Sequence, residues 1–313
     1  MRIIKCLVCT EYSETTAYHP RCAKELFDSA TPVSIDFFPK DVEELAKNLV
    51  NSHFAVPGVQ RKLSLGLEKS LDNTHRLTVV GVLGGTHILK PPSPEYPEMP
   101  ELEHITMLLA RLSGIKVAPC GLISMKDGSL AYIVRRFDRY GRNKKLAVED
   151  LCQLSELPSE SKYKGSCEKA GKVIRRFSHN PGDDALRFLE LAVFSFLVGN
   201  SDMHLKNYSL LESKVGVVGM SPAYDLLATQ LLLSDPEESA ITINGKKAHL
   251  KKSDFLALGK SLLLPDIVTE SCIERQLNMI EKWQQLVRRS FLSEVKQAAF
   301  SELINERGSR FRR

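Results

Sequence analysis

The chain has 313 residues, of which 43% are hydrophobic, and a net charge of +5. That length is enough for a sizeable core in one large domain or in two lobes. No apolar run reaches the roughly 18–20 residues of a membrane-spanning helix, and the N-terminus has no signal-peptide pattern. We therefore expect a soluble cytoplasmic protein without a membrane partner, and the mild positive charge favours acidic or phosphorylated ligands.

The beginning of the chain is predicted to be turn-rich and then to form strands. Residues 1–35 are expected as a small appendage, and residues 40–52 have the apolar spacing of a helix. Residues 59–67 alternate as a strand does. Residues 76–83 and 86–90 flank a Gly-Gly pair and predict a hairpin, because glycines supply the positive φ angles of a two-residue turn.

The next segment alternates between loop, helix and strands. Residues 91–101 carry five prolines and are expected as a loop. Residues 101–113 have the pattern of an amphipathic helix. Residues 120–125 and 129–137 read as two strands around a Lys-Asp-Gly turn.

Beyond about residue 138 the apolar period becomes helical. Helices are expected over 147–157, 166–178 and 184–198 and over most of 252–306, with one strand pair near 208–220. A sheet-rich part followed by a helix-rich part indicates an α+β fold of two lobes. The predicted domains are 1–35, an N-lobe over 36–137 and a helical C-lobe over 138–313.

Three of the seven cysteines lie close together in the sequence. Cys6, Cys9 and Cys22, with His19, form the pattern C-x2-C-x9-H-x2-C, whose spacing suits tetrahedral zinc. The other interpretation is a reduced, partly buried cysteine cluster. A disulfide framework is not expected in a chain of this size and compartment.

A lysine and a glutamate are candidates for one site. Lys90 ends a predicted strand, and Glu103 lies on a partly apolar helix face, where a carboxylate requires a cation. A strand lysine held by a helix glutamate is the pairing that places a lysine against nucleotide phosphates. A solvated lysine is the alternative when Lys90 is considered alone.

A turn and a polar loop complete the candidate residues. Pro57-Gly58 marks a tight turn before the first long strand, where a glycine lets backbone N–H groups approach phosphates. An ordinary turn is the alternative when this pair is considered alone. Asp202 and Asn207 follow the apolar helix directly, and Asp225 comes soon after. An Asp that accepts a hydroxyl proton, with an Asn and a second Asp that hold Mg²⁺, is what phosphoryl transfer requires.

These stretches, taken together, resemble a known family. VPGVQRKLSL, HILKP, ELEHITM, VRRFDR, GNSDMHLKN and YDLL are similar to the successive signature blocks of the HipA-like serine/threonine kinase toxins, in the same order, over residues 55–230. The resemblance implies a protein-kinase-like fold that binds ATP between a small sheet lobe and a helical lobe. The short branch called HipT, which lacks the extra N-terminal subdomain of full-length HipA, is the best match.

The resemblance implies a role for each matching residue. Lys90 would hold the ATP phosphates, oriented by Glu103, while Arg135 and Phe137 would offer backbone groups to the adenine. Asp202 would be the catalytic base, His204 would brace its loop and Lys206 would lie near the transferred phosphate. Asn207 and Asp225 would bind Mg²⁺. The phosphate loop would comprise Val56, Pro57, Gly58, Val59 and Gln60.

One position departs from the family pattern. Family members commonly carry a serine ahead of the glycine of the phosphate loop and switch themselves off by phosphorylating it, whereas this chain has Ala55. Either the switch is absent, or Ser52 or Ser64 serves instead, or Ala55 is an engineered replacement.

Two functions follow as hypotheses. The first is an ATP- and Mg²⁺-dependent kinase toxin that phosphorylates an aminoacyl-tRNA synthetase or another translation component. Its implied partners are a HipB-type helix-turn-helix antitoxin and a small protein resembling the missing subdomain, with DNA reached only through the antitoxin. The second is a catalytically weak binding protein that co-represses transcription with the antitoxin, using basic segments at 139–145 and 307–313. The complete set Lys90, Asp202, Asn207 and Asp225 favours the enzyme.

Overall fold

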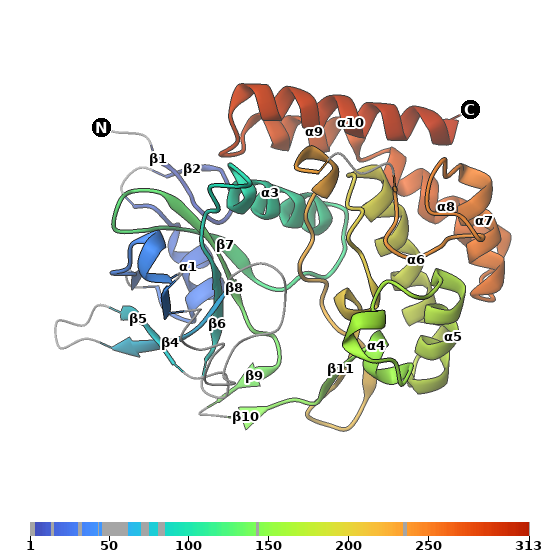
Figure 1. Ribbon diagram of the computed structural model, residues 1–313, viewed down its shortest axis with the longest axis horizontal. Helices are drawn as coiled ribbons and strands as arrows, with labels where there is room; N and C mark the ends of the chain where they lie inside the picture. Colours follow the sequence, from blue (N-terminus) through green and yellow to red (C-terminus); the bar gives the residue numbers. More distant parts are fainter. Residues whose placement is uncertain are drawn as a thin grey trace. The chain divides into compact units, whose positions relative to one another are not determined.

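The computed structural model divides the chain into two compact units (Figure 1). It describes residues 4–13, 16–30, 33–42, 44–45, 62–69, 75–80, 85–141, 144–233 and 237–312. The first unit comprises residues 1–105, 118–144 and 289–291, and the second comprises 106–117, 145–288 and 292–313. Within the described ranges, no helix is both long and apolar enough to cross a membrane.

The first unit is built on a six-stranded sheet of strand order β3-β5-β4-β6-β8-β7. Its pairs are antiparallel except for β3 and β5, which run parallel. The strands are β3 (Val33–Ser34), β4 (Leu63–Lys69), β5 (His75–Val79), β6 (His87–Lys90), β7 (Cys120–Ser124) and β8 (Leu130–Arg135).

The hairpin predicted from 76–83 and 86–90 is wrong. Strand β4 lies between β5 and β6 and pairs antiparallel with both, so that Leu65 faces Val79 on one side and His87 on the other. Leu63 and Leu65 are fully buried, which suits the central position of β4. The local Gly-Gly signal does not reveal that a strand from earlier in the chain separates the two segments, and Gly84 lies outside the described residues.

The other predicted hairpin of this unit is confirmed. Strands β7 and β8 pair antiparallel, and Gly128, with φ of 86°, turns the chain between them. Glycine adopts this left-handed conformation without steric cost, which explains the Lys-Asp-Gly turn. The short strands β9 (Arg139–Tyr140) and β10 (Lys144–Lys145) follow as a separate two-stranded sheet.

The N-terminal residues are part of the first unit. Strands β1 (Ile4–Lys5) and β2 (Tyr12–Ser13) form a small antiparallel pair, followed by helix α1 (Pro20–Phe27). Helix α1 lies next to the sheet in Figure 1 and shares one hydrophobic core with β4, β5, β6 and β8. Residues 39–42 and 44–45 are helical, and the rest of the predicted helix over 40–52 lies outside the described part of the chain.

Helix α3 begins at Met99, directly after the proline-rich loop, and ends at Leu112. The second unit is otherwise mainly helical. Its helices are α4 (Leu151–Leu154), α5 (Cys167–Phe177), α6 (Pro181–Leu197), α7 (Lys252–Ser261), α8 (Asp266–Leu277), α9 (Ile280–Arg288) and α10 (Glu294–Arg312). Helix α6 contacts α5, α7, α8 and α10 (Figure 1). This central position explains why α6 is apolar on most sides.

The predicted helix over 147–157 is only partly correct. Residues Val148–Asp150 form strand β11, which pairs with β12 (Ser209–Glu212), and β12 pairs with β13 (Val218–Met220). Asp150 then caps α4, because its carboxylate accepts a hydrogen bond from the Gln153 backbone N–H. A capping box of this kind starts a helix where the preceding residues are extended. The strand pair expected near 208–220 is confirmed.

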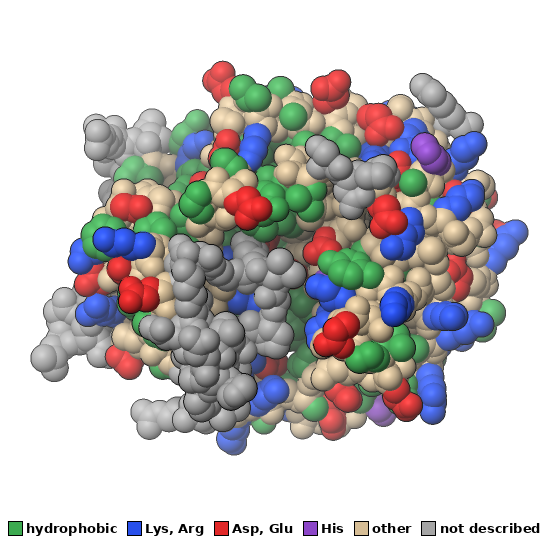
Figure 2. Space-filling model, in the orientation of Figure 1, with side chains coloured by type: hydrophobic (Ala, Val, Ile, Leu, Met, Phe, Trp, Pro, Cys, Tyr) green, Lys and Arg blue, Asp and Glu red, His purple; other side chains and the backbone are tan. Residues whose placement is uncertain are grey.

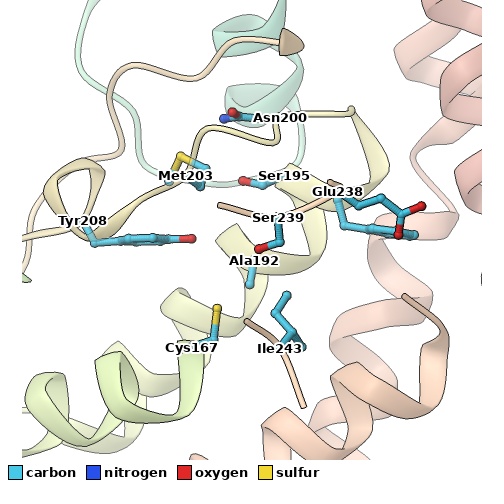
Figure 3. A pocket seen from close by; sticks show the side chains of 10 residues that line it. Cys167, Ala192, Ser195, Asn200, Met203, Tyr208, Glu238, Ser239 and Ile243 are labelled. Carbon is cyan, nitrogen blue, oxygen red and sulfur yellow. The ribbon is translucent and has the colours of Figure 1, made fainter. Parts of the chain in front are cut away.

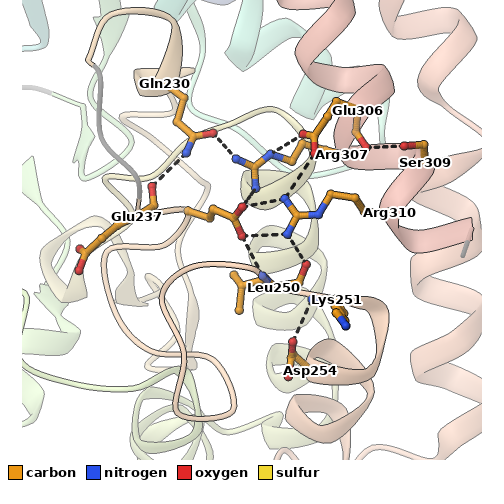
Figure 4. Close-up of polar contacts among 10 residues, drawn as sticks. Gln230, Glu237, Leu250, Lys251, Asp254, Glu306, Arg307, Ser309 and Arg310 are labelled. Carbon is orange, nitrogen blue, oxygen red and sulfur yellow. Dashed lines mark hydrogen bonds and ion pairs between the residues drawn. The ribbon is translucent and has the colours of Figure 1, made fainter.

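The basic C-terminal segment belongs to helix α10. Arg307 is 5% exposed and pairs with Glu238 at 2.8 Å, while Arg310 pairs with the same carboxylate at 2.7 Å (Figure 4). Phe311 is buried. Arg307 and Arg310 both form ion pairs with Glu238 inside the second unit, which weakens the DNA-contact hypothesis for this segment.

On the face drawn in Figure 2, Lys and Arg side chains are interspersed with Asp and Glu.

Candidate functional site

The first unit contains the predicted lysine–glutamate pair. The Nζ of Lys90, at the end of β6, lies 2.6 Å from Oε1 of Glu103 on α3. The two side chains are 6% and 1% exposed. Lys90 Nζ also lies 5.5 Å from the centre of the Tyr132 ring, a distance at which an aromatic face attracts a cation. The structure therefore joins these two predicted residues in a buried ion pair.

Helix α3 is held in place around Glu103 by apolar and polar contacts. Leu102 and Ile105 are fully buried, so the helix is anchored in the core just before and just after Glu103 in the sequence. The ring of the adjacent His104 hydrogen-bonds through Nε2 to the Val8 carbonyl at 2.9 Å. Because a carbonyl only accepts, this nitrogen is the donor. Glu103 therefore projects from a firmly positioned turn.

The predicted adenine-binding segment begins at Arg135, the last residue of β8, and continues into the next turn. The backbone N–H of Arg135 donates to the Pro119 carbonyl at 2.8 Å, so this N–H is not the group that would reach an adenine. Phe137 lies half-buried in the turn that follows. Arg136 donates two hydrogen bonds to the buried Asp138, at 3.0 and 2.8 Å. Sequence reasoning did not single out Asp138, which fixes this turn.

The predicted phosphate loop, Val56 to Gln60, lies outside the described residues, as do Ser52 and Ala55. Ser64, one of the alternative phosphorylation sites, is described. Its residue is 2% exposed in the central strand β4, and a Cβ added to Gly85 would lie 1.8 Å from its Oγ. Such close cover leaves no room for a phosphate group on Ser64 while the strand is folded.

In the second unit, the end of α6 leads into the predicted catalytic loop. Gly199 has φ of 71°, a conformation that glycine adopts readily. Its carbonyl accepts the Gln230 N–H at 3.1 Å, and the Ser201 N–H donates to Thr229 Oγ1 at 2.8 Å. The loop is thus fastened at its start to a segment that is about 30 residues later in the chain.

Asp202 is positioned by both its backbone and its side chain. Its carbonyl accepts the His204 N–H at 2.8 Å and the Asn207 amide at 3.0 Å. Its carboxylate accepts the hydroxyl of Tyr163 at 2.8 Å. Burial is the main cause of a raised pKa of Tyr163, and this hydrogen bond is the second cause. The hydroxyl therefore keeps its proton and acts as the donor. Tyr163 was not predicted, because nothing near Asp202 in the sequence marks it.

Lys206 and His204, the two other predicted catalytic residues of the loop, have different surroundings. Lys206 donates to Ser159 Oγ at 3.1 Å and lies 3.5 Å from a carboxylate oxygen of Asp150. His204 is buried, and its burial lowers its pKa, although the carboxylates of Asp202 and Asp225 oppose that shift. The neutral imidazole is therefore the form that faces these carboxylates near pH 7.

The two predicted magnesium ligands occur in suitable surroundings. The Asn207 side chain uses its amide nitrogen to bind the Asp202 carbonyl, which leaves its amide oxygen as the atom that could bind a cation. Asp225 has φ of 58°, an uncommon backbone conformation that often occurs at functional positions. The hydroxyl of its neighbour Tyr224 donates to the Lys206 carbonyl at 2.9 Å. Carboxylate and amide oxygens are the ligands that Mg²⁺ prefers, so these residues fit that ion.

A small pocket lies within the second unit (Figure 3). The predicted catalytic and metal-binding residues of the loop do not line it. Asn200, which lines it, accepts the Asp202 N–H through Oδ1 at 3.2 Å. The pocket therefore lies beside the catalytic loop, and Asn200 in its wall helps to hold that loop. Its lining residues are Cys167, Ala192, Ser195, Phe196, Asn200, Met203, Tyr208, Glu238, Ser239 and Ile243.

The four side chains of the Cys/His pattern converge in the first unit. One ligand atom from each of Cys6, Cys9, His19 and Cys22 lies within 4.8 Å of all the others. Cys6 and Cys22 are buried, and the other two are half-buried. The spacing in the sequence thus correctly predicted that these four side chains lie close together.

The sheet unit with its buried ion pair and the helical unit with its Asp–Asn loop define a protein-kinase-like α+β fold, as expected. The family model described as the HipA-like C-terminal domain matches residues 54–284, and the chain belongs to this family.

Individual relatives agree with this assignment. The chain is 36% identical over 208 residues to a Sinorhizobium fredii protein named "Putative kinase Y4mE", covering 64% of this chain and 48% of the relative. It is 29% identical over 209 residues to the serine/threonine-protein kinase toxin HipA of Shewanella oneidensis, covering 61% and 46%. The chain thus spans about half the length of these two relatives.

A solved structure supports the fold independently. The Shewanella oneidensis MR-1 toxin–antitoxin complex of HipA, HipB and operator DNA matches with a TM-score of 0.69 and 22% identity. The match covers 86% of this chain and 70% of that one. The HipA-like fold class is confirmed.

Proposed function

We propose that this protein is an ATP- and Mg²⁺-dependent serine/threonine protein kinase that acts as the toxin of a toxin–antitoxin system. The buried Lys90–Glu103 ion pair at 2.6 Å carries the proposal most directly. Withdrawing two charges from water is costly, and an apolar pair of similar size is often as stable. Such a pair in this family is best explained by a requirement to hold a lysine in place for nucleotide phosphates.

The chemistry would divide among the residues as follows. Asp202 accepts the proton of a substrate serine or threonine hydroxyl while that oxygen bonds to the γ-phosphorus and the bond to the β-phosphate oxygen breaks. Tyr163 keeps the accepting carboxylate oriented through its 2.8 Å hydrogen bond. Lys90 neutralises phosphate charge, and Asn207 and Asp225 would hold the metal. Bound Mg²⁺ supplies further neutralisation of the phosphate oxygens.

The substrate and partner also belong to the proposal. The Shewanella oneidensis relative is named a toxin, and its solved complex contains HipB and operator DNA. We take a HipB-type antitoxin as the restraining partner and an aminoacyl-tRNA synthetase, or another translation component, as the substrate. Incubation with radiolabelled ATP, Mg²⁺ and bacterial lysate tests this. A labelled translation protein supports the proposal, whereas a chain that transfers phosphate to no protein, including itself, contradicts it.

Replacement of Asp225 by Asn should raise the Mg²⁺ concentration needed for half-maximal activity. Asn tolerates the left-handed backbone at this position but removes the negative charge, so the shift isolates the role of charge. We expect this Mg²⁺ concentration to rise roughly 10-fold or more, since even the loss of an outer-shell partner lowers metal affinity by that factor. Asp183→Asn, at an exposed position of α6, is the matched control. An unchanged Mg²⁺ dependence in Asp225→Asn would show that Asp225 is not a ligand.

Long incubation with Mg-ATP should leave the chain unphosphorylated and active. Ala55 has no hydroxyl, and the buried Ser64 is covered by Gly85. Intact-mass measurement over time checks this, and a phosphate mapped to Ser52 or Ser64 would contradict it. Ala55→Ser should gain one phosphate and lose ATP affinity, because the added charge repels the ATP phosphates.

A further inference from the structure

The Cys/His cluster at the start of the first unit contains none of the residues proposed for phosphoryl transfer. Cys6 and Cys9 lie in the turn between β1 and β2, and His19 immediately precedes α1, whose first turn carries Cys22. The Thr10 N–H donates to the Cys6 carbonyl at 2.9 Å and closes the turn. Two separate backbone elements thus bring three thiols and one imidazole to one point.

Two of the distances between these side-chain atoms match those around a tetrahedral metal ion. Zinc–sulfur and zinc–nitrogen bonds of roughly 2.3 and 2.0 Å place a sulfur and a nitrogen ligand roughly 3.5 Å apart. His19 Nδ1 lies 3.3 Å from Cys9 Sγ and 3.8 Å from Cys22 Sγ. These separations fall on either side of the expected value, so a central ion would need little movement of His19 relative to Cys9 and Cys22.

The histidine is oriented as metal-binding histidines usually are. Nε2 of His19 lies 3.0 Å from the Tyr12 carbonyl. A carbonyl only accepts, so Nε2 carries the proton and Nδ1 keeps its lone pair. That lone pair belongs to the nitrogen nearest the cysteine sulfurs. A backbone carbonyl that fixes the tautomer in this way is the usual outer-shell partner of a histidine ligand.

We propose that Cys6, Cys9, His19 and Cys22 bind one structural Zn²⁺ ion. Three thiolates and one imidazole complete a four-coordinate shell, which is typical of structural rather than catalytic zinc, because no position stays open for water. Soft thiolate ligands in a tetrahedral arrangement also select zinc over Mg²⁺ or Ca²⁺.

The contacts of the turn indicate what the ion would stabilise. Between the two cysteines, the Leu7 carbonyl accepts the Leu122 N–H of β7 at 2.7 Å, and the Val8 carbonyl accepts from His104 of α3 at 2.9 Å. A Cβ on Gly121 would lie 2.8 Å from the Val8 side chain. The zinc-bound turn would therefore hold the sheet and α3 together next to Glu103.

Metal analysis of the full chain tests the proposal. Protein purified under reducing conditions, without chelator, should contain about one zinc per chain. Cys9→Ser should lose the metal, while Cys152→Ser should keep it. Cys152 is a matched control because it is buried in the second unit, and its Sγ donates to the carbonyls of Leu157 and Pro158 at 3.5 Å, two hydrogen bonds that a serine hydroxyl can replace.

Cobalt provides a second measurement that does not depend on the folding of a variant. Titration of metal-free wild-type protein with Co²⁺ should produce the visible bands of tetrahedral thiolate-bound cobalt, and added Zn²⁺ should abolish them. A chelator should lower the melting temperature of wild-type protein. A folded, reduced chain without zinc and without cobalt bands would overturn the proposal. So would a chain mass lower by two hydrogens, with a disulfide mapped among these cysteines.

Discussion

Replacement of Asp202 by Asn should reduce phosphate transfer by about 10²- to 10⁴-fold, the usual contribution of a general base. The fold should survive, because the loop is held mainly by the Asp202 backbone. Its carbonyl accepts the His204 N–H and the Asn207 amide, and its N–H donates to Asn200. An asparagine keeps all three contacts and can still accept the Tyr163 hydroxyl.

The effect should appear in the rate and not in binding. A base acts on the transition state much more than on the ground state, so kcat should fall while the affinity for Mg-ATP changes little. Steady-state kinetics together with nucleotide titration separate the two quantities. Asp183→Asn controls for the loss of one carboxylate from the second unit. A kcat of Asp202→Asn within a few-fold of wild type would remove Asp202 from the role of base.

Replacement of Lys90 by Met should destabilise the protein and abolish its activity together. Glu103 is 1% exposed and would lose the cation that lies 2.6 Å from it. Breaking a buried ion pair from one side costs about 3–5 kcal/mol, because the remaining charge stays buried. Denaturant unfolding followed by far-UV circular dichroism measures the loss.

A double replacement distinguishes the structural role of the pair from its functional role. Lys90→Met with Glu103→Leu removes both charges and leaves an apolar contact of similar volume, which is often neutral for stability. We expect the free energy of unfolding to recover most of its loss while ATP binding and phosphate transfer stay abolished. A double variant that regained transfer would show that Lys90 serves stability alone.

A surface ion pair of the same unit provides the control. Lys126 lies 3.1 Å from Asp36, and both side chains are about half exposed. Exposed pairs contribute about 0–1 kcal/mol, so Lys126→Met should change little. If Lys90→Met were no less stable than Lys126→Met, then breaking the buried ion pair would not destabilise the protein as expected.

The sequence alone determined the features that depend on neighbouring residues. The β7–β8 hairpin was predictable because the Lys-Asp-Gly turn lies between two apolar strands, and Gly128 adopts the positive φ that such a turn needs. The Asp202 loop and the Cys6 turn were also visible, since their chemistry is concentrated in short segments of fixed spacing. The order of the family blocks added the fold class, which the comparisons confirm.

Only the tertiary structure decided which distant segments meet. Strand β4 pairs with both β5 and β6, Tyr163 binds Asp202 from 39 residues away, and Arg307 and Arg310 turn inward to Glu238. A local apolar pattern says which face of an element is buried but not which element covers it. Partners are chosen by the burial of the whole core and by the need to pair every buried charge, and both are properties of the folded chain.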